Sequence, residues 1–302
     1  MNPLYDARQV RRAFSRAAAG YDAAARLQHA VEARLLEMLD YRDDPALQHA
    51  APQVVVDLGC GPGRAAAAMQ KRWPKARVLA LDLALPMLRE ARSSSKRGIN
   101  PFARRPQPLC ADARALPLAE NSVDVLFSNL CLQWVEDLDA VFAGFRRVLK
   151  PQGLLLLSTF GPDTLWELRE AFARADDAPH VSPFADIAGV GDALMRAGFH
   201  QPVLEREVET TAYPDLAALM RELRAIGATN ALAARRHTLT GRARFAAAER
   251  AYESLRNADG ALPASWETIT AMAWAPEPGA PIREDGFDVA RFPANAIPVR
   301  RR

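Results

Sequence analysis

Three aspartates and a run of glycines form the pattern with the clearest chemical meaning in this sequence. Asp57 closes the apolar run VVVDL, and Gly59, Gly61 and Gly63 follow it in the order GxGxG. Glycines in such a turn let the backbone approach a ligand without obstruction by side chains. A dinucleotide fingerprint has the order GxGxxG, and a carboxylate beside the turn would repel a pyrophosphate. The run therefore predicts that these four residues contact S-adenosylmethionine, which has a cationic head, rather than NAD.

Two more aspartates close the next two apolar runs. Asp82 ends LALD, where a carboxylate can accept both ribose hydroxyls, and Asp112 lies in CADA, where it can accept from the adenine amino group. Each aspartate alone could merely cap a helix. Three acids at successive strand ends beside a glycine turn favour a cofactor site instead. We expect three neighbouring residues at the same site: Leu83, Ala113 and Asn129.

The elements that must position these residues are short apolar runs alternating with helical stretches. Predicted strands begin at VVVDLG, RVLALDL, PLCAD, VDVLFSNL and LLLLSTFG, with helices between them and a tight turn at KPQG. This order is typical of βαβ units, and it predicts an α/β fold with a doubly wound, mostly parallel sheet. After Gly161 the regular alternation of strand and helix ends, and two predicted helices between residues 215 and 256 separate two further predicted strands. Together with residues 163–180, whose helix we expect to be capped by Asp163, they predict a cap over the carboxyl edge of the sheet.

Length and composition describe an ordinary globular chain of 302 residues with a formal charge of +3. The first residues have no apolar signal core, so the cytoplasm is the expected location. Three cysteines without a CxxC or Cys/His cluster suit reduced thiols and give no metal site. We expect an N-terminal helical lid (1–50), a cofactor-binding core (51–161), remaining strands with the inserted cap (162–277) and a flexible tail (278–302).

The motifs also resemble a known family. DLGCGPG, LALD and CADA resemble the first three motifs of class I S-adenosylmethionine-dependent methyltransferases, over about residues 54 to 160. With FSRAAAGYDAAARLQ, SNLCLQWVED, STFGPDTLWELREAF, HVSPFADI and YPDLAALMRELRAIGATNAL, nearly the whole chain resembles the malonyl-acyl-carrier-protein O-methyltransferases of biotin biosynthesis. The resemblance implies a Rossmann-like seven-stranded sheet. It also implies methylation of the free carboxylate of a malonyl thioester, giving the methyl ester primer for pimeloyl synthesis.

Such a reaction makes few chemical demands. A carboxylate is already ionised at neutral pH, so no general base is needed, and alignment and exclusion of water should supply the rate. Tyr21 is the candidate for shielding the sulfonium with its ring and orienting the acceptor with its hydroxyl, unless it is a packing aromatic. Gln28 is expected to reach the methionine end of the cofactor. Trp134 could line the pocket or pack in the core.

The acceptor carboxylate also calls for a cation, and guanidinium gives bidentate recognition. Arg146, Arg147 and Arg169 are candidates, of which Arg147 is preferred. His29 and His180 receive no catalytic role, because neither has metal-ligand spacing or an evident acidic partner.

Acyl-carrier proteins are acidic, so a partner enzyme should present basic residues. Two stretches qualify, and we expect the second, in the cap, to dock the carrier. The first holds Arg92, Lys96, Arg97, Arg104 and Arg105, and the second holds Arg235, Arg236, Arg242 and Arg244.

Two other functions stay open. One is a small-molecule, quinone-type methyltransferase. The other is a methyltransferase-like respiratory-complex assembly factor or hydroxylase, although the chain has no HxD or HxE triplet for a two-His-one-carboxylate iron site. The sequence does not separate malonyl-carrier protein from malonyl-coenzyme A.

Overall fold

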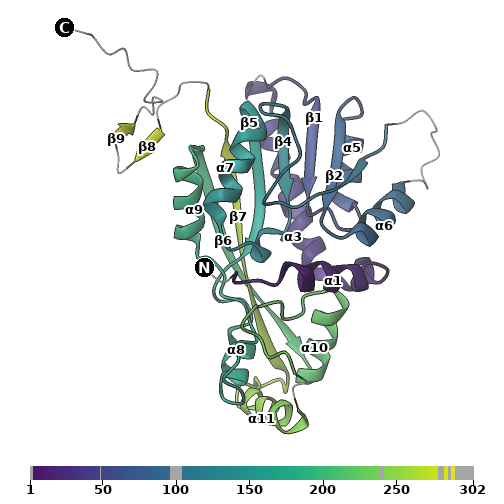
Figure 1. Cartoon of the computed structure of the whole chain (residues 1–302), viewed down its shortest axis with the longest axis vertical. Helices are drawn as coiled ribbons and strands as arrows, with labels where there is room; N and C mark the ends of the chain where they lie inside the picture. Colours follow the sequence, from purple (N-terminus) through teal and green to yellow (C-terminus); the bar gives the residue numbers. More distant parts are fainter. Residues whose placement is uncertain are drawn as a thin grey trace.

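The computed structural model describes residues 3–47, 49–95, 104–238 and 241–277, and the backbone of residues 282–284 and 287–289. Seven strands form one sheet in the order β3-β2-β1-β4-β5-β7-β6 (Figure 1). Strands β1 to β5 pair in parallel, and β7 runs antiparallel to both of its neighbours. This is the mostly parallel, doubly wound α/β fold that the sequence predicted. The strand bounds are β1 Val54–Leu58, β2 Arg77–Asp82, β3 Gln107–Cys110, β4 Val123–Ser128, β5 Leu149–Phe160, β6 His200–Tyr213 and β7 Leu262–Trp274.

Helices cover both faces of the sheet because alternate residues of each central strand point to opposite sides. Val55 and Val125 face a cluster that includes Met69 of α5, whereas Val56 and Leu126 face the cluster on the other side. The second cluster takes in residues of α7 and α9. The helices around the sheet are α3 Arg26–Glu37, α4 Leu39–Arg42, α5 Arg64–Arg72, α6 Leu85–Ser95, α7 Leu138–Val148 and α9 Ile187–Arg196, with 3-10 turns at η1 Pro45–Leu47 and η2 Leu132–Trp134.

The N-terminal segment is broken into two helices before α3. Helix α1 (Ala7–Ala17) is capped by the Asp6 carboxylate, and after a break that includes Gly20 the short α2 (Tyr21–Ala24) begins at Tyr21. In Figure 1, α1 lies across the molecule between the sheet and the cap. Residues 4–6 pair antiparallel with residues 231–233, so α1 is anchored to the cap at its start.

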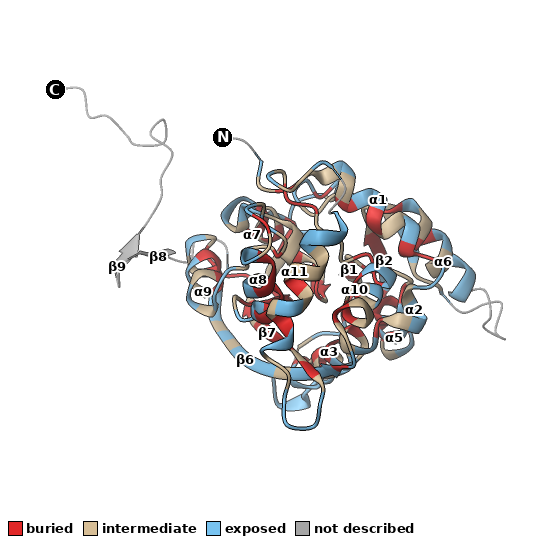
Figure 2. Ribbon diagram, turned by 90° about the horizontal axis from the view of Figure 1, so that it is seen from below, coloured by how far each residue is buried: buried red, intermediate tan, exposed pale blue. Residues whose placement is uncertain are grey.

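The cap is carried by the two longest strands. β6 and β7 stay paired from Val208↔Glu267 to Tyr213↔Leu262, beyond the last pair of β5 with β7, Phe160↔Thr268. Helices α8 (Trp166–Ala173), α10 (Leu216–Ala225) and α11 (Arg242–Glu253) pack on this extension around a separate apolar cluster. Viewed from below, β6 is largely exposed beside these helices (Figure 2). Its outer edge carries charged residues, which protect an edge strand from pairing with another chain.

Some local predictions were wrong. Asp163 does not cap α8, whose N-cap position is Leu165; the Asp163 carboxylate instead pairs with Arg206. KPQG lies inside β5, with Gln152 at φ 58°, rather than before the strand. The predicted tail lies outside the described residues apart from β8 (Ile282–Glu284) and β9 (Phe287–Val289), which pair with each other. No described helix is long and apolar enough to cross a membrane.

Candidate active site

The glycine turn after β1 combines a left-handed backbone with an open side. Gly61 has φ 51°, and a Cβ there would meet only Tyr21 Cε1, at 3.8 Å. Gly63 has φ 82°, and a Cβ there would lie 2.7 Å from the Cβ of Ala91 in α6. Gly61 therefore leaves room for a ligand under Tyr21, while Gly63 permits close packing of two helices.

A cavity of about 110 Å³ opens at this turn, at the carboxyl ends of the strands. Asp82 is its central acid: its two oxygens accept from the backbone N–H groups of Gly61 (3.0 Å) and Ala84 (2.7 Å). Burial raises the pKa of Asp82 to about 6. Among the predicted site residues, those that line this cavity are Tyr21, Gly59, Gly61, Asp82, Leu83, Asp112, Ala113 and Asn129.

The second acid of the cavity is held ionised. Arg114 donates from Nε (3.0 Å) and Nη2 (2.6 Å) to the Asp112 carboxylate, and this pairing lowers the pKa of Asp112. Asn129 is fixed from two sides: its Nδ2 donates to the backbone oxygen of Gln28 (3.0 Å), and its Oδ1 accepts from Ser158 (2.8 Å). An open glycine turn between two carboxylates fits a nucleoside with hydroxyl and amino donors and a cationic head.

Three predicted cofactor residues do not line this cavity. Asp57 lies behind the turn, fully buried, and accepts from the backbone N–H of Ala66 (2.8 Å), so it caps α5. Its pKa is raised well above the ordinary value by burial. Gly63 faces Ala91 instead of the cavity, and Gln28 lines a neighbouring cavity. An acidic residue at the end of a strand can either cap the next helix or face a ligand, and its position in the sequence does not distinguish the two.

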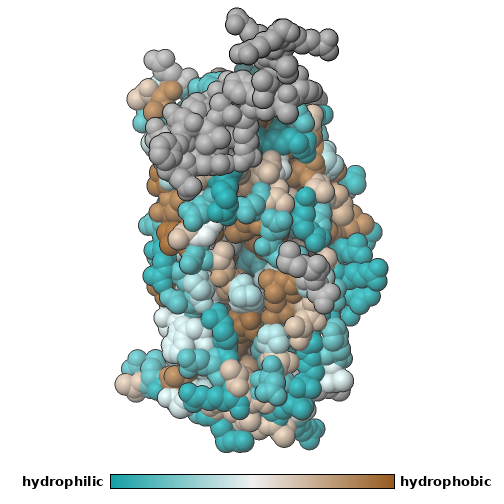
Figure 3. Space-filling model, turned by 60° about the vertical axis from the view of Figure 1, so that its left-hand side comes forward, coloured by the Kyte–Doolittle hydropathy of each residue, from teal (hydrophilic) through white to brown (hydrophobic). Residues whose placement is uncertain are grey.

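The neighbouring cavity is larger, about 240 Å³, and mainly apolar. Aromatic and aliphatic side chains of the lid, β5, α8, α10 and β7 form its wall, and apolar groups are visible at mid-height in Figure 3, between hydrophilic surfaces. Four residues line both cavities: Phe14, Tyr21, Leu130 and Trp134. The two cavities therefore meet at Tyr21.

Tyr21 is a neutral phenol in this position. Burial, followed by the nearby Asp82 charge, strongly raises the pKa of its hydroxyl. Among the described residues the hydroxyl has no hydrogen-bond partner, so its proton is free for a ligand. Trp134 both packs and lines the cavities, with its ring edge-on to those of Tyr5 (6.2 Å) and Phe14 (5.5 Å).

Two basic side chains line the second cavity, and neither was assigned a role from the sequence. Arg224, in the last turn of α10, is exposed and has no ion pair among the described residues. His180 stacks on Phe172 with ring centroids 4.0 Å apart, and its Nε2 lies 3.2 Å from Asp176 Oδ2. The apolar periodicity of α10 was readable, but no sequence signal indicated that Arg224, rather than its neighbour Arg221, faces the cavity.

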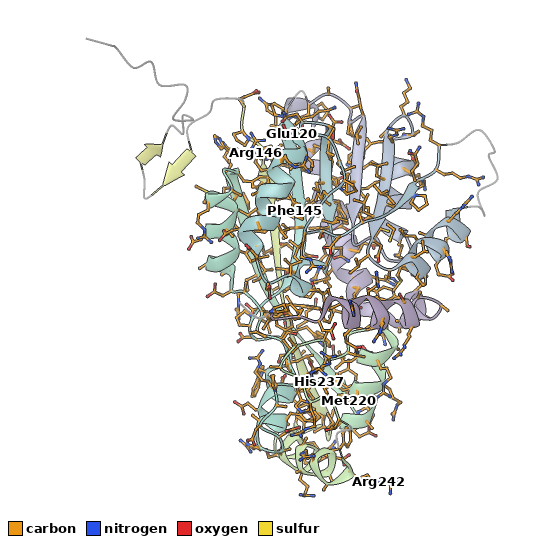
Figure 4. The ribbon with its side chains drawn as sticks, viewed as in Figure 1. Glu120, Phe145, Arg146, Met220, His237 and Arg242 are labelled. Atoms are coloured by element: carbon orange, nitrogen blue, oxygen red, sulfur yellow. The ribbon has the colours of Figure 1, made fainter. Side chains whose placement is uncertain are left out.

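The preference for Arg147 was wrong. Its guanidinium donates to the backbone oxygens of Leu116 and Leu118, both at 2.9 Å, and it lines neither cavity. Helix α7 returns the chain to the start of β5, so its last turn lies at the opposite edge of the sheet. The neighbouring Arg146 marks this edge in Figure 4, far from Met220 in the cap. Arg146 and Arg169 likewise donate to backbone oxygens.

The predicted docking residues divide into two groups. Arg235 pairs with Asp6 (2.9 Å) and Arg236 with Asp176, so both are used inside the molecule. Arg242 and Arg244 are exposed, and Arg242 lies at the far tip of the cap (Figure 4). In the other basic stretch, Arg92 already has an interaction partner, and Arg104 donates a hydrogen bond to the Lys75 backbone oxygen. Lys96 and Arg97 lie outside the described residues.

Known proteins resemble this chain over its core and over its full length. A family model described as "Methyltransferase domain" matches residues 56–157. A malonyl-[acyl-carrier protein] O-methyltransferase of Xylella fastidiosa is 60% identical over 302 residues, covering 100% of this chain and 99% of that protein. The biotin biosynthesis bifunctional protein BioHC of Saccharophagus degradans is 38% identical over 86% of this chain and 45% of its own length. A solved putative methyltransferase of Bacillus halodurans superposes with a TM-score of 0.59 at 16% identity, covering 82% of this chain and 100% of that one, which shows the fold.

Proposed function

The chain belongs to the malonyl-[acyl-carrier protein] O-methyltransferase family, and from that premise we propose that it transfers a methyl group to the free carboxylate of a malonyl thioester on acyl-carrier protein. The product would be the methyl ester that primes pimeloyl synthesis in biotin formation. The observation that carries the proposal is the meeting of two cavities at Tyr21, one with a nucleoside-binding arrangement and the other apolar with a cation.

The first cavity would hold S-adenosylmethionine, whose sulfonium supplies an electrophilic methyl group. Asp82 would accept the ribose hydroxyls while keeping the backbone hydrogen bonds that orient it. Asp112, kept ionised by Arg114, would accept from the adenine amino group. Gly61 would give the methionine portion room to pass beneath Tyr21.

The second cavity would hold the malonyl group with its carboxylate toward Tyr21. The phenol can donate a hydrogen bond to one carboxylate oxygen and cannot remove a proton, because its pKa is raised. A carboxylate nucleophile needs orientation and exclusion of water, and no general base. Apolar walls formed by residues such as Leu130 and Phe160 would supply the exclusion.

Arg224 takes the role that the sequence had suggested for Arg147. It is a guanidinium at the second cavity with no internal partner among the described residues, so it is available to select an anionic acceptor. An uncharged quinone-type acceptor would gain nothing from this cation, which favours the carboxylate over that alternative. The carrier itself would meet basic residues outside the cavity, and of the four predicted in the cap only Arg242 and Arg244 stay candidates.

The test is methyl transfer from radiolabelled S-adenosylmethionine to malonyl-acyl-carrier protein. Malonyl-coenzyme A and unloaded carrier serve as parallel acceptors. We expect base-labile label on the malonylated carrier and none on the unloaded one. Intact cofactor binding without transfer to either malonyl thioester would refute the proposed acceptor.

A further inference from the structure

The outer face of α1 carries an unbalanced stripe of arginines. Arg8, Arg11, Arg12 and Arg16 are all exposed, and their spacing of three, four and eight residues places them on one side of the helix. The helix contains no acidic residue. The nearest acid, Asp6, is already engaged by Arg235 and by the backbone N–H of Gln9.

Other arginines of the surface are paired within the chain. The half-buried Arg34 contacts Glu207 and Glu209, and the half-buried Arg72 contacts Asp40 and Asp43. Arg8, Arg11, Arg12 and Arg16 have no ion pair with any residue that the structure describes. Four like charges along less than three helical turns repel one another, so the stripe costs stability unless an anionic partner neutralises it.

The position of the stripe ties it to the reaction. The opposite face of α1 is buried through Val10, Ala13 and Ala17, while Phe14 lines both cavities. Arg11, at the margin of the stripe, also lines the first cavity. Helix α10, which contacts α1, adds exposed Arg221 and Arg224 beside the second cavity. A basic surface therefore extends from the lid to the rim of the acceptor cavity.

We propose that the outer face of α1, continued by Arg221 and Arg224 of α10, is the principal docking surface for the acidic acyl carrier. This inference rests on the proposed function and differs from the sequence-based expectation of docking on the cap. Charge complementarity selects the occupant. The apolar face of α1 packs against the protein interior, so the helix has no free apolar face to insert into a lipid bilayer. A carrier seated on α1 would lie directly above the junction of the cavities and could deliver its arm past Arg224.

The proposal predicts how charge-removing variants change the kinetics. The triple variant Arg8→Gln, Arg12→Gln and Arg16→Gln keeps good helix formers and leaves the cavity-lining residues of α1 unchanged. Its KM for malonyl-acyl-carrier protein should rise roughly tenfold, the sum of three surface ion pairs of ordinary strength. Its kcat and its affinity for S-adenosylhomocysteine should stay at the wild-type values. The salt dependence of KM should flatten, because fewer charges steer the encounter.

The matched control is Arg242→Gln with Arg244→Gln, which removes unpaired charge from the tip of the cap. We expect its KM to change less than twofold, as for an exposed charge outside the interface. A wild-type KM in the α1 variant, or a rise confined to the cap variant, would overturn the inference. So would binding of wild type but not the α1 variant to phosphatidylglycerol vesicles with unchanged carrier kinetics. Failure of the wild type to methylate malonyl-carrier would instead count against the proposed function.

Discussion

Asp82 should make cofactor binding depend on pH. In the free protein, burial holds the pKa of this carboxyl at about 6. The ribose hydroxyls and the cationic head of the cofactor both favour the ionised form, so binding lowers the pKa. Protons and cofactor then compete, and affinity should fall as the pH drops through 6.

The magnitude follows from the ionised fraction of Asp82. With a pKa of about 6, this fraction is about 0.9 at pH 7 and about 0.1 at pH 5. The dissociation constant of S-adenosylhomocysteine should therefore rise about tenfold over this interval, which equals about 1.4 kcal/mol. Asp112 contributes no such dependence, because Arg114 keeps its pKa low.

Isothermal titration calorimetry at constant ionic strength, in steps from pH 5 to pH 8, measures this dependence. Asp82→Asn should bind weakly at every pH and show a flat profile, whereas Asp112→Asn should bind less tightly than wild type and keep the slope. A flat profile in the wild type would refute the reasoning. A slope that persists in Asp82→Asn would assign the titration to another group, such as the buried Asp57.

Three further predictions, two of them with a control variant, separate roles that the structure distinguishes. Tyr21→Phe should lower kcat about tenfold through loss of one hydrogen bond to a charged acceptor, with the S-adenosylhomocysteine affinity unchanged by calorimetry; full turnover would remove the role of the hydroxyl. Arg224→Gln should raise the KM for malonyl-carrier at least tenfold, while Arg147→Gln should leave it unchanged, and the reverse result in steady-state assays would restore the sequence-based choice. Gly63→Ala should lower the unfolding free energy by about 2–4 kcal/mol, because it combines a left-handed backbone with a collision. Gly144→Ala, in open space within α7, should raise it by about 0.5–1 kcal/mol in the same denaturant titration.

The sheet and the cofactor cavity were largely predictable because strand order fixes where residues meet. Parallel strands bring their carboxyl ends to one edge, so Gly61, Asp82, Asp112 and Asn129 had to converge whatever the loops did. Asp57 shows the limit of this reasoning. It occupies a strand end as the others do, yet its side chain turns inward to the N–H of Ala66, and only the χ angles decide that direction.

The acceptor cavity was less predictable because its wall comes from segments far apart in the chain. Phe14, Leu165, Met220 and Trp266 meet there only after the lid and cap close over the sheet. Arg147 was chosen for its position before a strand, but α7 carries it to the edge opposite the cavities. Helical periodicity identifies a buried stripe, and it does not say which exposed arginine faces a cavity formed by other elements.

Methylation of a carboxylate requires correct positioning and charge recognition rather than proton transfer. The residues around the junction of the two cavities are consistent with this requirement. Tyr21 stays protonated because it is buried near Asp82, so it can orient a carboxylate without competing for a proton. His180, the other titratable side chain of the second cavity besides Arg224, is tied to Asp176, whose pKa is lowered chiefly by Arg236. We expect selectivity for an anionic acyl group to rest on Arg224 at the cavity, and selectivity for an acidic carrier to rest on the arginines of α1 outside it. An acceptor lacking the carboxylate would lose the first contact, and one lacking an acidic carrier would lose the second.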